Sequence, residues 1–562
     1  MTIDRSPTDV DRLAEQYLDD SMALDPIAAT FAGLRGHDDR LTDHSPAGHA
    51  ARAALARGTL DRLAALQPVD DVDRVTAAAL AERLGHLLAL HEAGLDLGDL
   101  NNIACAVQSV REVFDITPTA TADDWAAVTA RLHAVRTSLD GYRESLLEAR
   151  AGGWVPPARQ VRAAAGQAEE FAAPDGFFAG LPGAAQLDGG GRPPGEDALR
   201  GAADAAASAY ADLAGWLRAE LLPGARADDA VGADVYVLAA TGFLGTRIDP
   251  EETYAWGLEE LARIEDEAAA VARRLVPDAA PDRDPRKLVD LAVEALDADP
   301  GRLLHGTDAL LAWMQDLSDR AVSELGGTHF AIAEPLRRLR CRIAPSTAGG
   351  IYYTPPSEDF DRPGQMWWSV TPDVTTFSTW RETTTVFHEG VPGHHLQVGG
   401  TVALAGQLNR WRRLGCWVSG HGEGWALYAE RLMAELGYLD DPGDLLGMLD
   451  AQALRACRVV VDLGVHLRLP APAEVGGGVW DAGKAWAYLT AHTRLPEGNR
   501  RFELDRYLGW PGQAISYKVG ERVWLDLRDR ATARGTDLRT FHDAALRLGS
   551  VGLDVLTRAL TP

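Results

Sequence analysis

Apolar residues recur at spacings of three and four along most of the chain, with polar residues between them. This period is that of amphipathic α-helices. Thr121 can cap the longest such segment, and Gly152-Gly153 can end it. The pattern predicts a mainly α-helical protein, with helices over residues 8–24, 46–67, 71–94, 122–150, 197–222, 250–275 and 307–325.

Stretches rich in glycine and proline interrupt the helical pattern. Residues 155–195 form the longest of them and residues 277–286 another, so both are predicted to be loops. Between residues 341 and 374, short apolar and aromatic runs lie between turn signals, which is typical of strands. The predicted strands span residues 342–345, 350–354 and 366–370.

The size of the chain allows a large core. It has 562 residues, of which 46% are hydrophobic. We expect two regions, residues 1–340 and 341–562, that belong to one integrated fold and border a cleft. The net charge of −27 makes nucleic acid and anionic membranes poor partners.

The N-terminus and the cysteines bear on the location of the protein. The first eleven residues are polar and acidic, unlike a signal peptide, and no apolar run is long enough to cross a bilayer. The cysteines are scattered without a CxxC pair, which is typical of reduced core residues: Cys105, Cys341, Cys416 and Cys457. The sequence predicts a cytoplasmic protein and leaves its oligomeric state open.

The strongest chemical signal is the segment 387–397, which reads FHEGVPGHHLQ. A His-Glu pair followed by another histidine is typical of zinc hydrolases, in which two histidines bind the ion and the glutamate is the general base. In the simplest form, HExxH, the histidines are four residues apart on one helix. Here Pro392 stands four residues after His388, and the next histidines are His394 and His395.

This departure requires a break in the helix. Two histidines on one zinc have ring nitrogens roughly 3 Å apart, whereas a straight helix would separate these residues by nearly two turns. Pro392 disrupts a helix, and the glycines on either side of it permit unusual backbone angles. We expect the segment to bulge and return so that His394 joins His388, with His395 as the alternative ligand. A Pro-Gly turn with surface histidines is the structural alternative.

A third ligand is expected from the segment 419–430, which reads SGHGEGWALYAE. Glycines open it, and a helix is predicted from Glu423 onward. Glu423 and Glu430 are seven residues apart and therefore share one helix face. We assign Glu423 as the ligand. For Glu430, a hydrogen bond to a ligand and an ordinary exposed position are equally open.

A third cluster lies in the segment 503–520, ELDRYLGWPGQAISYKVG. Its Trp-Pro-Gly turn precedes a helix predicted to begin near Gln513, with Tyr517 and Lys518 on its first turns. A phenol O–H can stabilise the oxyanion that forms when water attacks an amide. Tyr517 is therefore the candidate oxyanion donor, with a buried structural tyrosine as the alternative. Lys518 is a candidate for substrate contact.

Further candidates for substrate contact are spread along the chain. Tyr353 lies in a predicted strand that could pair with the backbone of a bound peptide, and a structural hairpin explains it equally. His466 lies on an apolar helix, where a core role is the alternative. The segment 494–506 contains four arginines: Arg494, Arg500, Arg501 and Arg506. One of them could bind a substrate carboxylate, while the others are expected to be solvated surface charges.

These motifs resemble the signatures of a bacterial family catalogued as domain of unknown function 885. HEGVPGHHLQ, EGWALYAE and RYLGWPGQAISYKVG carry the likeness, and the segments 25–34 and 349–356 extend it over nearly the whole chain. Members of that family are regarded as zinc metallopeptidases. More distantly, the order of these residues is similar to that in the helical oligopeptidases and the angiotensin-converting-type peptidases.

The resemblance implies that His388, His394 and Glu423 bind one zinc ion, with Glu389 as the base and Tyr517 as the oxyanion donor. It also implies a large helical, zincin-like fold with a cleft and a small β patch next to the metal helix. The expected activity is hydrolysis of amide bonds in short peptides or peptide-like molecules. The alternatives are a zinc enzyme that acts on a specialised metabolite and a protein that binds metal or peptide without catalysis.

Overall fold

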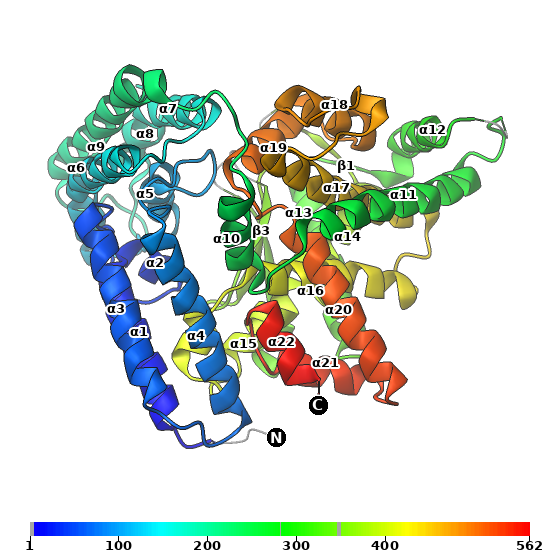
Figure 1. Cartoon of the computed structure of the whole chain (residues 1–562), viewed down its shortest axis with the longest axis horizontal. Helices are drawn as coiled ribbons and strands as arrows, with labels where there is room; N and C mark the ends of the chain where they lie inside the picture. Colours follow the sequence, from blue (N-terminus) through cyan, green and yellow to red (C-terminus); the bar gives the residue numbers. More distant parts are fainter. Residues whose placement is uncertain (1–4, 281–282, 345–349, 372, 562) are drawn as a thin grey trace.

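The computed structural model describes residues 5–280, 283–344, 350–371 and 373–561. It is 66% helical with 5% strand, which confirms the predicted mainly α class. Figure 1 shows the N-terminal helices on one side of the molecule and the remaining helices, with the small sheets, on the other.

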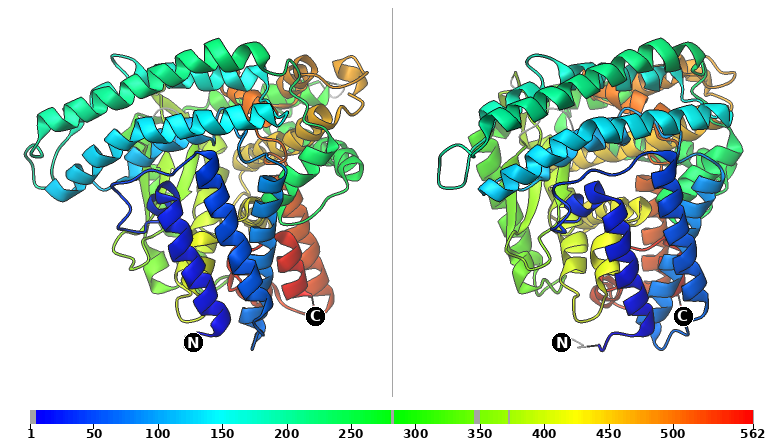
Figure 2. Two further views of the ribbon diagram at one scale, coloured as in Figure 1. Left: turned by 60° about the vertical axis from the view of Figure 1, so that its left-hand side comes forward. Right: turned by 90° about the vertical axis from the view of Figure 1, so that its left-hand side faces the viewer.

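The N-terminal helices form two groups. Helices α1, α3 and α4 pack along one another, while α6 and α9 lie side by side across their ends (Figure 2). The side chain of Thr121 accepts a hydrogen bond from the Asp124 amide at the start of α6, as predicted. The helices are α1 (Asp9–Leu24), α2 (Pro26–Phe31), α3 (Pro46–Ala64), α4 (Asp71–Glu92), α5 (Ala106–Ile116), α6 (Ala122–Ala151), α7 (Ala158–Ala172), α8 (Phe177–Ala184) and α9 (Glu196–Trp216).

The prediction of a loop over residues 155–195 is wrong for most of its length, because α7 and α8 occupy it. Pro157 precedes the first residue of α7 and therefore marks a helix start. The apolar face of α7 consists of Val161 and small alanines, a pattern that is easy to miss in a sequence. Residues 185–195 are irregular, as predicted.

The remaining helices surround the predicted metal motifs. Helix α11 packs along α17, α16 along α20, and α14 against both α16 and α17. The helices are α10 (Ala233–Leu244), α11 (Pro250–Leu275), α12 (Pro285–Asp297), α13 (Thr307–Leu325), α14 (Thr379–Glu389), α15 (Gly400–Val402), α16 (Ser419–Glu435), α17 (Pro442–Leu467), α18 (Ala482–His492), α19 (Glu497–Gly509), α20 (Ser516–Ala533), α21 (Leu538–Leu546) and α22 (Leu553–Leu560).

Short helical turns link these helices. The π-helical segments are η1 (Leu217–Leu221), η5 (His395–Gly399) and η6 (Trp411–Gly415). The 3₁₀ turns are η2 (Leu222–Gly224), η3 (Pro300–Arg302), η4 (Glu334–Arg337) and η7 (Ala473–Val475).

The strands form two small sheets beside α14. In the first, β4 (Gly364–Trp368) lies between a parallel β2 (Leu339–Ile343) and an antiparallel β3 (Ile351–Thr354). In the second, β1 (Leu303–His305) pairs with an antiparallel β5 (Thr376–Ser378). The predicted strands overlap β2, β3 and β4 but are shifted by up to three residues. Pro345 and Gly349, which belong to the predicted strand 342–345 and the segment 349–356, lie outside the described residues, as do residues 281–282 of the connection 277–286.

Two hydrophobic cores hold the fold together. The smaller core contains residues between Ile27 and Leu221, chiefly from α5 to α9. The larger core contains residues from Val10 to Leu556. It therefore includes residues on both sides of position 340, and the two cores do not divide the chain at that position.

Helices α16 and α20 approach each other at glycines. A Cβ atom added to Gly424 would lie 2.4 Å from the carbonyl carbon of Gly520, and one added to Gly520 would lie 2.0 Å from the carbonyl oxygen of Gly420. No side chain fits in either place. Helix α16 begins at Ser419, four residues earlier than the predicted start at Glu423. The glycines that were predicted to precede the helix lie inside it.

We predict that Gly424→Ala destabilises the protein by about 1–3 kcal/mol, because the added methyl group overpacks the contact between α16 and α20. Gly58 in α3 offers a matched control, since a Cβ there meets nothing within 4 Å. Gly58→Ala should stabilise the protein by about 0.5–1 kcal/mol. Thermal and denaturant unfolding of both variants measures this. Equal stability of Gly424→Ala and the unmodified protein would contradict the close approach.

Candidate metal centre and its cavity

His388 and His394 meet because the chain turns back after α14. His388 and Glu389 occupy its last turn, Gly390 ends the helix, and His394 precedes η5. A Cβ atom on Gly393 would lie 1.9 Å from the His388 carbonyl oxygen, so the turn packs directly against the helix end. The centres of the two imidazole rings are 4.8 Å apart, and the ring planes are nearly perpendicular. The predicted bulge is therefore present.

Glu423 faces both histidines from α16. Its Oε2 lies 3.4 Å from Nε2 of His388 and 3.5 Å from Nε2 of His394, and one donor atom from each residue lies within 4.8 Å of the others. Two ligands that are each 2.0–2.1 Å from a tetrahedral zinc are about 3.3 Å apart. The three side chains therefore fit a zinc ion in type, and the two distances from Glu423 to the histidines match this spacing.

Glu430 orients His388. Its buried carboxylate accepts a hydrogen bond from Nδ1 of His388 at 2.7 Å, which leaves Nε2 to face Glu423. A carboxylate behind a ligand histidine fixes the ring and its tautomer. Burial alone lowers the pKa of His388, but the two glutamates outweigh it and raise that pKa to about 10. Burial raises the pKa of Glu423, yet the two histidines hold it far below its usual range.

Glu389 lies beside the cluster and lines the same cavity as its three residues. Its side chain is buried, and its Oε2 has no hydrogen-bond partner among the described residues. Burial raises the pKa of this carboxylate, and the neighbouring charges of His394 and His388 oppose that shift only in part. A carboxylate in this position is free to accept a proton.

His395 does not share the placement of His394. Its Nε2–H donates to the Leu336 carbonyl and its Nδ1 accepts from the Tyr353 hydroxyl, both at 2.9 Å. Burial lowers the pKa of His395 to about 4, so the ring is neutral. Both nitrogens are therefore engaged, and neither is available to a metal. His421 is also buried apart from the cluster, with its Nδ1 3.5 Å from the Val551 amide.

A cavity of ≈ 900 Å³ opens over the cluster. His388, Glu389, His394 and Glu423 line it, and so do Tyr353 and Tyr517. Half-exposed aromatic side chains also contribute to its walls, where they offer apolar contact area: Phe31, Tyr352 and Trp417.

The other predicted contact residues are not all at this cavity. His466 and Lys518 are absent from its described lining. His466 is buried and hydrogen-bonded to the Tyr507 carbonyl at 2.8 Å. Lys518 is buried in a network with Glu260, Gln452 and Glu521. These placements favour a structural role for both residues over direct contact with a substrate.

The sequence interpretation missed two arginines on α17. Arg455 and Arg458 both line the cavity, together with Arg506 from α19. Their spacing of three residues places them on one face of α17, within the largely apolar stretch 453–461. Two charges among Ala, Val and Leu residues are the signal that could have revealed them.

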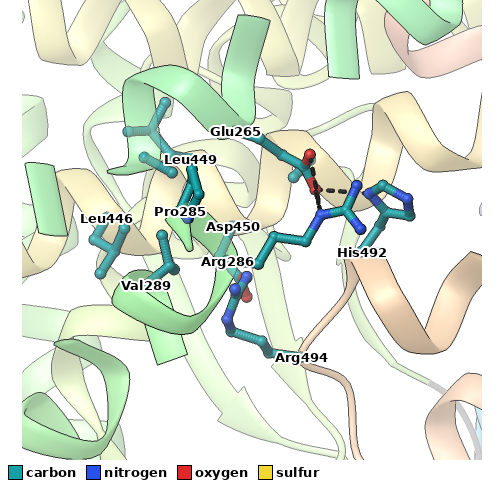
Figure 3. A pocket seen from close by; sticks show the side chains of 11 residues that line it. Glu265, Pro285, Arg286, Val289, Leu446, Leu449, Asp450, His492 and Arg494 are labelled. Atoms are coloured by element: carbon teal, nitrogen blue, oxygen red, sulfur yellow. Dashed lines mark hydrogen bonds and ion pairs between the residues drawn. The ribbon is translucent and has the colours of Figure 1, made fainter. Parts of the chain in front are cut away.

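A second hollow is small, and its charged side chains are paired. It has a volume of ≈ 20 Å³, room for about one water molecule. Figure 3 shows Glu265 facing Arg286 and His492. The charged side chains here form ion pairs: Arg286 with Glu265 at 3.3 Å, and Arg494 with Asp450 at 3.0 Å. The charged side chains described at this hollow are therefore engaged with one another or with neighbouring charges.

A family model of bacterial proteins of unknown function, DUF885, matches residues 26–560. The chain belongs to this family. No curated protein matches the chain. Among solved structures, a "putative lipoprotein" from Colwellia psychrerythraea is 24% identical with a TM-score of 0.84, and each chain is 98% covered. A "putative lipoprotein of unknown function" from Shewanella oneidensis is 17% identical with a TM-score of 0.74, over 98% of this chain and 99% of that one.

At these identities the likeness shows a shared fold. The word lipoprotein describes those two proteins, and it gives no support to the cytoplasmic location expected for this chain. Among the described helices, none is long and apolar enough to cross a membrane.

We predict that the purified protein holds about one zinc ion per chain and that His394→Ala loses most of it, because two protein ligands are too few. His395→Ala is the matched control. It should retain the zinc and lower the melting temperature, since it removes two buried hydrogen bonds. Elemental analysis and thermal melting of both variants measure this. Zinc loss in His395→Ala with full retention in His394→Ala would reverse the assignment.

Proposed function

We propose that this protein is a zinc-dependent hydrolase that cleaves amide bonds in short peptides or peptide-like molecules. One observation carries the proposal: the carboxylate of Glu389, whose Oε2 has no hydrogen-bond partner among the described residues, lies beside a three-residue cluster suited to zinc, at the wall of a large cavity. A protein that only bound a metal would have no use for a buried base in that position. The size of the cavity is at the upper end of the range for pockets that hold small molecules, which suits peptides of a few residues.

His388, His394 and Glu423 would hold the ion, and Glu430 would keep His388 oriented. Zinc bound there would act as a Lewis acid that polarises the amide carbonyl and activates water. Glu389 would accept a proton from the attacking water as its oxygen bonds to the carbonyl carbon. When the C–N bond breaks, the same carboxyl would return the proton to the leaving amine. The products are a carboxylate and an amine.

Tyr517 would stabilise the oxyanion. Its ring lies under Arg458, with the guanidinium carbon 4.7 Å from the ring centre, and its hydroxyl accepts a hydrogen bond from Arg506 at 3.2 Å. These contacts fix the ring at the cavity wall and leave the phenolic proton free to donate. A donor that meets negative charge as it develops lowers the barrier.

The proposal is tested by incubating the zinc-loaded protein with a mixture of short peptides and identifying the released amines by mass spectrometry. We expect cleavage that a chelator abolishes and added zinc restores. Peptides that all remain intact with the zinc-loaded protein would overturn peptide hydrolysis as the function.

Glu389→Gln should retain zinc and fold but lose at least about a hundredfold in turnover, because the amide cannot accept the proton. Zinc content and melting temperature, measured on the same preparation, distinguish loss of chemistry from loss of structure. Near-normal turnover in this variant would show that Glu389 is not the base.

Tyr517→Phe should lower turnover by about a hundredfold with little change in KM, because the lost hydrogen bond forms mainly in the transition state. Tyr210→Phe is a matched control, since that buried hydroxyl bonds to the Val107 carbonyl in the smaller core. It should lower only stability. Steady-state kinetics and melting temperatures of both variants decide the matter. Unchanged turnover in Tyr517→Phe would remove Tyr517 from the mechanism.

A further inference from the structure

Two arginines from different helices meet at the wall of the cavity. Arg458 on α17 donates from Nε to the Tyr507 hydroxyl at 2.8 Å and from Nη2 to Glu503 at 2.9 Å. Arg506 on α19 donates from Nη2 to Gln513 at 2.6 Å, and its Nη1 lies 3.4 Å from Glu503. We call Arg458 and Arg506 the arginine pair.

The arginine pair has more positive charge than its surroundings neutralise. Arg458 and Arg506 are 6% and 9% exposed, so both charges are removed from bulk water. Among the described residues, Glu503 is the carboxylate that forms ion pairs with them, and it carries one charge against two. Nη1 of Arg458 and Nε of Arg506 also have no hydrogen-bond partner there. A buried, uncompensated guanidinium is costly unless an anion joins it.

The other arginines considered from the sequence are engaged elsewhere. Arg494 pairs with Asp290 and Asp450. Arg501 is mostly exposed and pairs with Glu497 on the same helix. Arg500 bonds to Thr490 and the Leu495 carbonyl. Of those four arginines, Arg506 is the one that lines the cavity.

We propose that the arginine pair binds the terminal carboxylate of the substrate, so that the enzyme acts at the C-terminal end of peptides. This inference rests on the proposed hydrolase function. Guanidinium groups bind carboxylates through paired, charge-assisted hydrogen bonds. Tyr517 contacts both arginines, and in the proposed mechanism it would also be the oxyanion donor. The bound carboxylate is therefore close to the reacting carbonyl, which places the cleaved bond within the last residues of the peptide.

Binding can be measured apart from cleavage with the full-length, zinc-loaded protein carrying Glu389→Gln. The ligands are N-acetyl-trialanine with a free carboxylate, the same peptide with a C-terminal amide, and an amidated N-acetyl-Ala-Ala-Glu. We expect calorimetry to show that the free acid binds at least about tenfold more tightly than either amide, as the loss of a charged hydrogen bond implies. Tight binding of the Glu-containing amide would instead assign the arginine pair to an acidic side chain and overturn the proposal.

Substitutions show which arginine causes the preference for the free acid over the amide. Arg506→Gln should reduce the preference for the free acid to near unity, and Arg506→Lys, which keeps the charge but not the paired geometry, should reduce it in part. Arg501→Gln, on the same helix but with an exposed side chain, should leave the preference unchanged. If Arg506→Gln does not fold, Arg506→Lys still decides the matter. A preference that persists in the Arg506 variants would overturn the assignment.

The outcomes also separate this inference from the proposed function. Equal binding of acid and amide would overturn the carboxylate subsite and leave peptide hydrolysis standing. If neither form binds, the carboxylate subsite is overturned, and cleavage of the peptide mixture still decides whether the protein is a peptide hydrolase.

Discussion

The indole N–H of Trp425 donates a hydrogen bond to the carbonyl of Pro392 at 2.8 Å. This bond joins the two segments that hold the candidate metal ligands, because Trp425 lies on α16 two residues after Glu423 and Pro392 lies in the turn that returns His394 to His388. Both partners are buried, so loss of the donor would leave a carbonyl without a partner. The three-residue cluster depends on this junction.

Close packing supports the junction from the other side. Gly424 and Gly520 let α16 and α20 touch backbone to backbone. The same contact brings the start of α20, with Tyr517, to the cavity that His388 and Glu423 line. Distant parts of the sequence therefore reach one site because small residues permit the helices to approach. Trp425 holds the turn that positions His394, and Glu430 orients the ring of His388.

Much of this arrangement could be predicted because it follows from local rules. The 3.6-residue period located helices such as α6 and α11 to within a residue or two, and the Pro-Gly interruption explained how His394 returns to His388. Helix α7 was missed because its buried face consists largely of alanine, which gives a weak apolar signal. The role of Glu430 stayed open because the spacing of seven residues places it on the same helix face as Glu423 but does not show that it bonds to His388. The arginine pair depends on how α17 meets α19, which no local pattern encodes.

Diffraction from zinc-grown crystals at the zinc absorption edge tests the central claim most directly, because the anomalous signal locates the ion without assumptions about its ligands. We expect one strong peak about 2.0–2.2 Å from Nε2 of His388, Nε2 of His394 and the carboxylate of Glu423. An anomalous peak beside other residues, or a protein that contains zinc but shows no peak at this cluster, would contradict the proposed metal centre.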